Sequence, residues 1–249
     1  MNNQRPYCLT VGGFDPTAGA GVLADCKTFE MLEVYGMAVI SSNTLQTDNC
    51  FVGVDWMPLI TVKSQLETML KSYPIKVVKI GLVQNFEMLY QIIRIVKNYD
   101  PEVMIVWDPI LQSSSGYHFH SKVTLELDFI ELNCTVITPN WNEFEALWGT
   151  DTHVLSDKKC PAAVLIKGGH RLDKMGCDLL FENGVFTEIQ GTSFNGKSKH
   201  GTGCVLSSAI AAYLAQGNSL IDSCTKAKNY VERFIQSNDL NLGYHYGNK

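Results

Sequence analysis

The chain has 249 residues, of which 45% are hydrophobic and 18% charged, so it can bury a globular core of ordinary size. A formal net charge of −5 argues against nucleic acid as the main partner, and the apolar runs are too short to span a bilayer. The N-terminus lacks the apolar segment of a signal peptide, and the eight cysteines include no C-x-x-C pair. We therefore expect a cytoplasmic protein with reduced thiols and no membrane partner.

Short apolar strands alternate with amphipathic helices along the whole chain. The predicted strands are residues 7–11, 37–41, 76–80, 103–107, 134–137 and 163–166, followed by a hairpin of 179–181 and 185–189 around Asn183 and Gly184. The predicted helices are residues 20–33, 62–72, 86–98 and 205–215, and a last one that starts at Ser219. Near-continuous apolar strands suit a parallel sheet covered on both faces. The sequence predicts one doubly wound α/β domain over residues 1–249, with an antiparallel edge.

Polar residues follow several of these strands directly. Asp108, Asn140 and Lys167 each stand where a predicted strand ends. Since ligands of such sheets bind beyond the carboxyl ends of the strands, we expect the three to converge on one crevice with the loop of residues 201–204. Each alone could also be a loop residue that caps a helix. Glu143 follows Asn140 at the start of a helix, where a carboxylate is also favoured by the helix dipole.

The segment of residues 200–204 precedes the alanine-rich helix. Glycines on both sides of Thr202 let backbone N–H groups turn toward one point, and the positive helix end favours an anion there. Cys204 lies in the first turn, where the helix end and a bound cation would favour its thiolate. A rival interpretation pairs Cys204 with His200 as a thiol nucleophile and its base. Adjacency in sequence does not establish that geometry, and His200 is more simply a loop residue.

The glycine-rich stretch of residues 12–21 matches the dinucleotide pattern G-x-G-x-x-A only loosely, because no acidic residue ends the next strand. Asp25 lies on the inward side of the following helix, so it needs either a ligand or a helix-to-loop hydrogen bond. None of the six histidines has metal-ligand spacing, and residues 116–120 are expected to form a loop that partly covers the site.

In their order, these segments resemble the hydroxymethylpyrimidine/phosphomethylpyrimidine kinases of the ribokinase-like superfamily. The matching segments are residues 12–16, 19–21, 24–25, 27–29, 35–36, 46, 79–81, 108–109, 115–116, 138–140 with 143, 167–170 and 200–204. The resemblance extends to about Ser237. It implies a three-layer α/β/α fold and ATP- and Mg²⁺-dependent phosphorylation of 4-amino-5-hydroxymethyl-2-methylpyrimidine, and of its monophosphate, in thiamine biosynthesis. It also implies a homodimer.

The resemblance assigns roles to individual residues. Gln46 would read the pyrimidine edge, in a pocket with Asp25, Gly13, Leu82 and Ile110. The anion hole for the transferring phosphoryl group would consist of Gly201, Thr202, Gly203 and Cys204. Asp108 and Glu143 would organise magnesium together with Asn140, and Lys167 and Asn140 would contact the nucleotide.

Several features set this chain apart from the family pattern, among them a shorter and altered tail at residues 242–247. Ser114 replaces the family's usual lysine, which bears on the second phosphorylation, and Leu82 stands where methionine is common. The cysteine at position 204 stands where most of the superfamily has an aspartate base. The alternatives are a pyridoxal or pyridoxine kinase on the same scaffold, a nucleobase-binding protein without catalysis, and a cysteine-dependent transferase.

Overall fold

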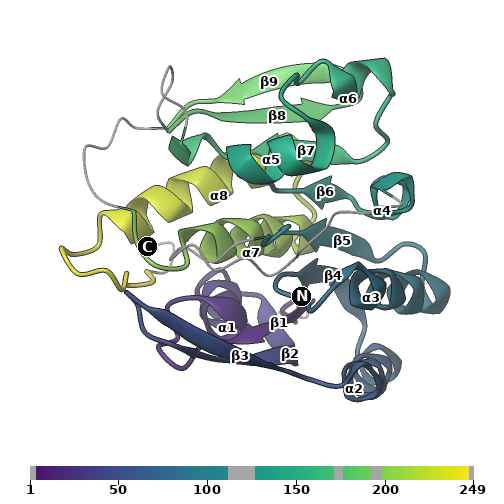
Figure 1. Ribbon diagram of the computed structural model, residues 1–249, viewed down its shortest axis with the longest axis vertical. Helices are drawn as coiled ribbons and strands as arrows, with labels where there is room; N and C mark the ends of the chain where they lie inside the picture. Colours follow the sequence, from purple (N-terminus) through teal and green to yellow (C-terminus); the bar gives the residue numbers. More distant parts are fainter. Residues whose placement is uncertain (1–3, 112–126, 171–175, 192–197, 247–249) are drawn as a thin grey trace.

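A computed structural model describes residues 4–111, 127–170, 176–191 and 198–246 (Figure 1). Its centre is a nine-stranded sheet in the order β3-β2-β1-β4-β5-β6-β7-β8-β9. The strands are β1 (Tyr7–Phe14), β2 (Tyr35–Gln46), β3 (Phe51–Trp56), β4 (Ile75–Ile80), β5 (Met104–Trp107), β6 (Val136–Ile137), β7 (Ala163–Ile166), β8 (Asp178–Glu182) and β9 (Val185–Ile189). The pairs from β2 to β7 are parallel, as predicted.

Antiparallel strands complete the sheet at both edges. The predicted hairpin of β8 and β9 is confirmed, and Asn183 and Gly184 adopt positive φ angles at its turn. The other edge was not predicted: β2 continues past Ser41 as far as Gln46, and β3 pairs with this extension. The extension is polar in sequence because it leaves the apolar centre of the sheet.

Helices cover both faces of the sheet. They are α1 (Gly21–Met31), α2 (Leu59–Ser72), α3 (Phe86–Tyr99), α4 (Leu127–Asn133), α5 (Trp141–Trp148), α6 (Val154–Asp157), α7 (Thr202–Ala215) and α8 (Leu220–Ile235). One apolar layer joins the sheet to α2, α3, α4, α5 and α6, and the other joins it to α1, α7 and α8. Along β1, Leu9 and Val11 face the first layer and Cys8 faces the second. This is the predicted three-layer α/β/α arrangement.

Helix α7 is the most buried helix on its face of the sheet. Residues 204–214 are all buried, and the helix contacts β1, β4, β5, α1 and α8. Its many alanine and serine residues permit this close packing, because they bring little side-chain volume. The helix begins at Thr202, three residues earlier than predicted, so the 201–204 segment lies at its N-terminus. Among the described residues, no helix has the length and apolar character needed to cross a membrane.

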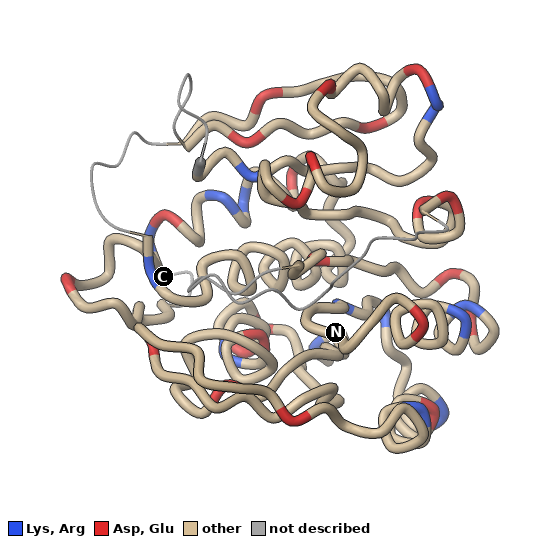
Figure 2. The backbone as a smooth tube through the Cα atoms, viewed as in Figure 1, with Lys and Arg blue, Asp and Glu red and all other residues tan. Residues whose placement is uncertain are grey.

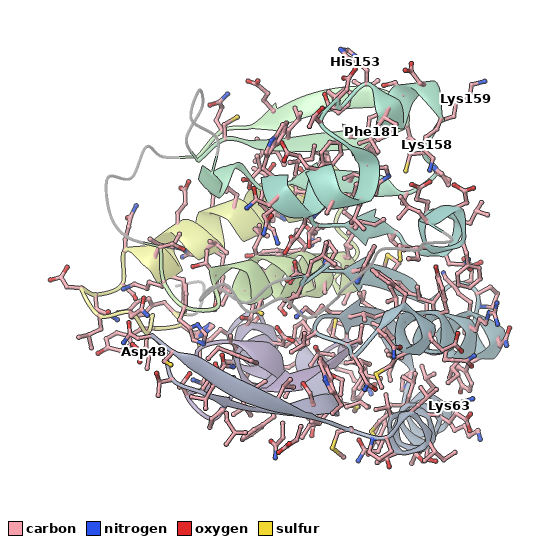
Figure 3. The ribbon with its side chains drawn as sticks, viewed as in Figure 1. Asp48, Lys63, His153, Lys158, Lys159 and Phe181 are labelled. Atoms are coloured by element: carbon pink, nitrogen blue, oxygen red, sulfur yellow. The ribbon has the colours of Figure 1, made fainter. Side chains whose placement is uncertain are left out.

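The buried carboxylate of Glu131 forms a cluster of polar contacts away from the carboxyl ends of the strands. Glu131 accepts hydrogen bonds from Trp148 Nε1 (2.8 Å) and Lys158 Nζ (3.0 Å), which ties α4 to α5 and α6. Figure 3 shows Lys158 on the opposite side of the molecule from Asp48, which lies at the end of β2. We therefore regard this cluster as structural. Figure 2 shows the basic residues of α8 well away from those of α2 and α3.

Candidate active site

The site lies where the loops after β1, β5 and β7 meet the N-terminus of α7. Gly201 is the N-cap of α7 and has φ +77°, a conformation that favours glycine. A Cβ atom on Gly201 would lie 1.9 Å from the carbonyl oxygen of Gly19, so the two loops touch through backbone alone. The first peptide groups of α7 therefore sit beside the glycine-rich loop that follows β1. That arrangement suits an anion.

Asp108 and Lys167 converge beside this helix end, as the sequence predicts, and Glu143 joins them. Lys167 Nζ donates to Asp108 Oδ1 (2.8 Å) and lies 3.7 Å from Glu143 Oε2. A Cβ on Gly203 would lie 3.5 Å from Lys167 Nζ and 3.9 Å from Asp108 Oδ2, so this cluster directly adjoins α7. A backbone contact joins the segments that carry these side chains. The Lys167 N–H donates to the carbonyl of Pro139 (2.8 Å), the residue before Asn140.

The charges of the cluster follow from burial and mutual contact. Burial raises the pKa of the Asp108 carboxyl, but the nearby Lys167 and Lys79 ammonium groups outweigh it, so the net pKa is lower than usual. Burial, assisted by the negative charge of Asp108, raises the pKa of Glu143 to about 7 although Lys167 opposes the change. Asp108 is therefore the anion that pairs with Lys167 at neutral pH, while Glu143 titrates there.

Asn140 and Glu143 also have a local task. Asn140 Oδ1 accepts from the Glu143 backbone N–H (2.9 Å), and Glu143 Oε2 accepts from the Asn140 N–H (2.7 Å). This reciprocal pair is a capping box that starts α5. The helix-start preference noted in the sequence therefore holds, and the same carboxylate also reaches Lys167.

The protonation state of the Cys204 thiol differs from the one expected from sequence. The side chain is buried, and burial raises its thiol pKa to about 11, although Lys79 and a backbone hydrogen bond from Gly21 act in the opposite direction. The expectation that the helix end would favour the thiolate is therefore wrong for the free protein. Desolvation outweighs the helix end, and the carboxylates of Asp25 and Asp108 oppose a further negative charge.

Asp25 lies beneath the site rather than on an open wall of it. Its carboxylate is fully buried and accepts from Lys79 Nζ (2.9 Å), Thr10 Oγ1 (2.6 Å) and Ser208 Oγ (2.7 Å). These partners belong to β4, β1 and α7, so Asp25 joins three elements to α1. Lys79 was not predicted, although a lysine inside the apolar strand 75–80 is an unusual residue that signals a buried partner.

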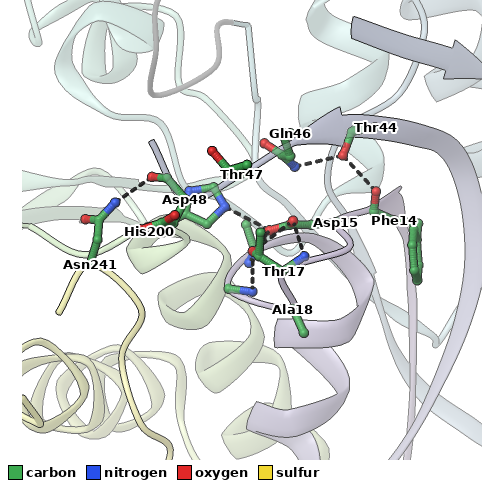
Figure 4. A network of polar contacts seen from close by, with 12 residues as sticks. Phe14, Asp15, Thr17, Ala18, Thr44, Gln46, Thr47, Asp48, His200 and Asn241 are labelled. Carbon is green, nitrogen blue, oxygen red and sulfur yellow. Dashed lines mark hydrogen bonds and ion pairs between the residues drawn. The ribbon is translucent and has the colours of Figure 1, made fainter. Parts of the chain in front are cut away.

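A second network of polar contacts joins the loop after β1 to His200, which lies just before α7 (Figure 4). His200 Nε2 lies 2.8 Å from Asp15 Oδ2, and Asp15 also accepts from the backbone N–H groups of Thr17 and Ala20. Burial raises the pKa of Asp15, but the hydrogen bonds from His200 and Thr17 outweigh it, so the pKa is lower than usual. His200 therefore contacts Asp15 and holds the loop.

Gly13, Leu82 and Gln46 lie near one another at the ends of β1, β4 and β2. A Cβ on Gly13 would lie 3.2 Å from Leu82 Cδ2 and 3.6 Å from Thr44 Cγ2, and Gln46 Nε2 donates to Thr44 Oγ1 (2.8 Å). Ile110 Cδ1 lies 3.8 Å from a Cβ built on Gly81, beside Lys79. The expected covering loop at 116–120 and Ser114 lie outside the described residues.

Solved structures of kinases share this fold. The chain is similar to the pyridoxal kinase of Staphylococcus aureus in complex with pyridoxal, with a TM-score of 0.81 and 27% identity over 94% of this chain and 89% of that one. It is similar to the phosphomethylpyrimidine kinase of Clostridium difficile 630, with a TM-score of 0.76 and 32% identity over 92% and 99% of the two chains. The protein is thus a small-molecule kinase with a ribokinase-like fold.

Sequence comparison narrows the class. The family described as phosphomethylpyrimidine kinase matches residues 15–249. The hydroxymethylpyrimidine/phosphomethylpyrimidine kinase of Aquifex aeolicus is 35% identical over 95% of this chain and 97% of its own, and that of Bacillus subtilis is 32% identical over 96% and 92%. The chain belongs to the phosphomethylpyrimidine kinase family.

Proposed function

We propose that the protein transfers the γ-phosphoryl group of ATP to the hydroxymethyl group of 4-amino-5-hydroxymethyl-2-methylpyrimidine, and then phosphorylates the monophosphate for thiamine biosynthesis. The observation that carries the proposal is the meeting of Asp108 and Lys167 with Gly203 at the start of α7. Phosphoryl transfer needs positioning and neutralisation of negative charge more than covalent chemistry. A helix N-terminus and a lysine supply both.

Each group has a defined task in this proposal. The backbone N–H groups of residues 201–204 face the transferring phosphoryl group, and Lys167 contacts the nucleotide phosphates together with the Asn140 amide. Gln46, Gly13, Leu82 and Ile110 surround the pyrimidine. Asp25 supports the pocket from beneath through its hydrogen bonds to Lys79 and Ser208.

The donor set fits a magnesium ion that is shared with nucleotide phosphates. Within the described residues, no group of three or more His, Cys, Asp or Glu could hold a metal ion by itself. Magnesium commonly takes one or two carboxylates and completes its coordination with phosphate and water oxygens. Asp108 and Glu143 are the carboxylates proposed to hold it. When bound, the ion neutralises phosphate charge.

Cys204 lies in the first turn of α7, next to the charge of Lys79. As a base it would take the proton of the substrate hydroxyl onto Sγ while the alkoxide oxygen forms its bond to phosphorus and ADP leaves. As a positioning group it would hold the hydroxyl with its proton retained. Substitution by alanine removes both tasks, so we expect Cys204→Ala to lose most turnover and Cys204→Asp to retain part of it. Unchanged turnover in the alanine variant would remove the base assignment.

Phosphorylation of pyridoxal is the second candidate, because pyridoxal kinases are among the similar structures. A coupled assay with ATP and Mg²⁺ tests hydroxymethylpyrimidine, its monophosphate and pyridoxal side by side. We expect turnover of both pyrimidines. Turnover of pyridoxal alone would overturn the main proposal, and ATP consumption with none of the three would leave only the class of kinase.

The site lies in one chain, and we propose that two copies associate as a homodimer in the cytoplasm. The support for this is membership of the family. Light scattering coupled to size-exclusion chromatography measures the mass in solution, and a mass equal to one chain would contradict the dimer.

A further inference from the structure

Ser42 carries a buried hydroxyl group that makes no hydrogen bond to any of the described residues. The residue lies on β2 where the strand pairs with Gly13 of β1 on one side and with Trp56 of β3 on the other. The side chain is fully buried, and within the described part of the chain its Oγ has no hydrogen-bond partner. The preceding residue behaves differently, since Ser41 Oγ donates to the Leu82 carbonyl. Buried hydroxyl groups are normally paired, so the unpaired one needs an explanation.

The hydroxyl oxygen of Ser42 lies next to the position that a side chain on Gly13 would occupy. A Cβ on Gly13 would lie 2.9 Å from Ser42 Oγ and 3.2 Å from Leu82 Cδ2. Ser42 Oγ therefore borders the same space as two residues of the proposed pyrimidine pocket. A larger residue at position 13 would cover this hydroxyl.

Gln46 stands nearby with a fixed orientation. The Phe14 carbonyl can only accept, so Thr44 Oγ1 donates its proton to it (2.8 Å). Thr44 Oγ1 must then accept from Gln46 Nε2 (2.8 Å), which turns Gln46 Oε1 away from Thr44 (Figure 4). Gln46 thus offers a carbonyl acceptor, whereas the Ser42 hydroxyl retains a proton to donate. An aminopyrimidine edge has the complementary pattern, an amino donor beside a ring-nitrogen acceptor.

We propose that Ser42 is a substrate-contacting, specificity-determining residue whose hydroxyl donates a hydrogen bond to a ring nitrogen of the bound heteroaromatic alcohol. The inference rests on the proposed function, because it needs a ring in the space beside Gly13. Thr44 acts through Gln46 and is a positioning residue. The bound ligand would supply the hydrogen-bond partner that Ser42 lacks among the described residues.

The test compares Ser42→Ala with the wild-type protein in calorimetric titrations without ATP. The ligands are hydroxymethylpyrimidine and the analogue in which C–H replaces the ring nitrogen next to the amino group. We expect the wild type to bind the analogue about 5- to 20-fold more weakly, because the analogue leaves the buried hydroxyl unpaired. Ser42→Ala should bind the pyrimidine about 5- to 20-fold more weakly than the wild type and should not distinguish the two ligands. In turnover assays, KM for the pyrimidine should rise while KM for ATP stays unchanged.

Ser223→Ala is the matched control, because Ser223 is also a fully buried serine but donates to Ser219 within its own helix. It should keep the discrimination between the ligands. The thermal midpoint of ligand-free Ser42→Ala should not fall, since no protein hydrogen bond is lost. A lower midpoint with unchanged affinity, or discrimination retained by Ser42→Ala, would overturn the inference alone. Failure of the wild type to bind or phosphorylate the pyrimidine would overturn the proposed function as well.

Discussion

Cys204 shows how the environment of a single residue decides its chemistry. A thiol at a helix N-terminus next to Lys79 has two features that favour the thiolate, yet burial and the carboxylates of Asp25 and Asp108 outweigh them. The thiol is therefore protonated in the free protein. A bound substrate or cation that changes this balance is needed before Cys204 can act as a base.

This predicts slow alkylation of Cys204 by iodoacetamide. With a pKa of about 11, roughly one molecule in 1,000 carries the thiolate at pH 8, and the residue is only 8% exposed. Cys50 is exposed and serves as an internal reference. We expect Cys50 to react at least about ten times faster, as measured by mass spectrometry of digested samples over time. Equal rates would mean that burial does not protect Cys204.

The buried pair of Asp25 and Lys79 gives a second prediction. Lys79→Met leaves the Asp25 carboxylate buried without its cation, which we expect to lower the free energy of unfolding by about 3–5 kcal/mol. Lys71→Met is the control, because Lys71 forms a surface pair with Glu67 and its side chain is 68% exposed. It should change stability by less than about 1 kcal/mol. Urea denaturation measures both, and similar losses would contradict a special role for the buried pair.

The sequence predicted the position of a site residue well when that residue directly follows a strand of the parallel sheet. Asp108 and Lys167 follow directly on β5 and β7, so parallel pairing brings them together. The hydrogen-bond partners of Asp25 could not be predicted in this way. Lys79 and Ser208 lie 54 and 183 residues away, and only the packing of α1 against β4 and α7 brings them to one carboxylate.

At the scale of elements, the start of α7 contains two glycines with different tasks. Gly201 is held in a left-handed conformation against Gly19, whereas Gly203 lies within the helix beside Asp108 and Lys167. Gly201 is required because of its left-handed backbone conformation and its close approach to Gly19. The other leaves space where the proposed phosphoryl group passes.

Substitution by alanine separates these tasks. Gly203→Ala meets its neighbours at ordinary contact distance, so stability should hold or rise by about 0.5–1 kcal/mol because alanine favours helix. Its turnover should fall at least about tenfold, since the methyl group occupies the space beside Lys167. Gly201→Ala should lose stability and turnover together. Thermal unfolding and the coupled assay measure both variants, and full activity in Gly203→Ala would place the phosphoryl group elsewhere.

The elements that the sequence missed have weak signals of their own. Strand β3 contains Gly53 in its middle, and its six residues are half-buried or exposed, so no apolar run marks it. The polar end of β2 pairs with β3 along its length and with β1 at Ser42 and Asn43. Helices α4 and α6 have only seven and four residues, and they are held by the apolar layer and by the contact of Glu131 with Lys158. Long apolar periodicities predict elements well, and short ones depend on tertiary contacts.

At the scale of the whole molecule, Glu143 makes stability depend on pH. Its pKa rises from 4.5 to about 7 on folding, so the folded protein binds this proton more readily than the unfolded chain. The contribution of Glu143 is therefore fully present below about pH 4.5 and is lost as the pH rises through about 7.

We expect the wild type to lose about 1–3 kcal/mol of unfolding free energy relative to Glu143→Gln between pH 5 and about pH 7.5. Glutamine preserves the capping box because it can accept the same backbone hydrogen bond, and it does not ionise. Denaturation curves at several pH values measure the difference between the two proteins. A difference that grows in favour of the wild type would have the wrong sign.

The contacts of the loop after β1 also determine when the site can form during synthesis of the chain. Asp15 contacts His200, which is added to the growing chain 185 residues later, and Gly19 contacts the next residue, Gly201. A nascent chain that ends before α7 can form β1 and its neighbouring strands. It lacks His200 and Gly201, which contact the loop after β1 in the folded protein. The proposed nucleotide site is therefore incomplete until residues 200–204 have been added, so nucleotide can assist folding at this site only from that point on.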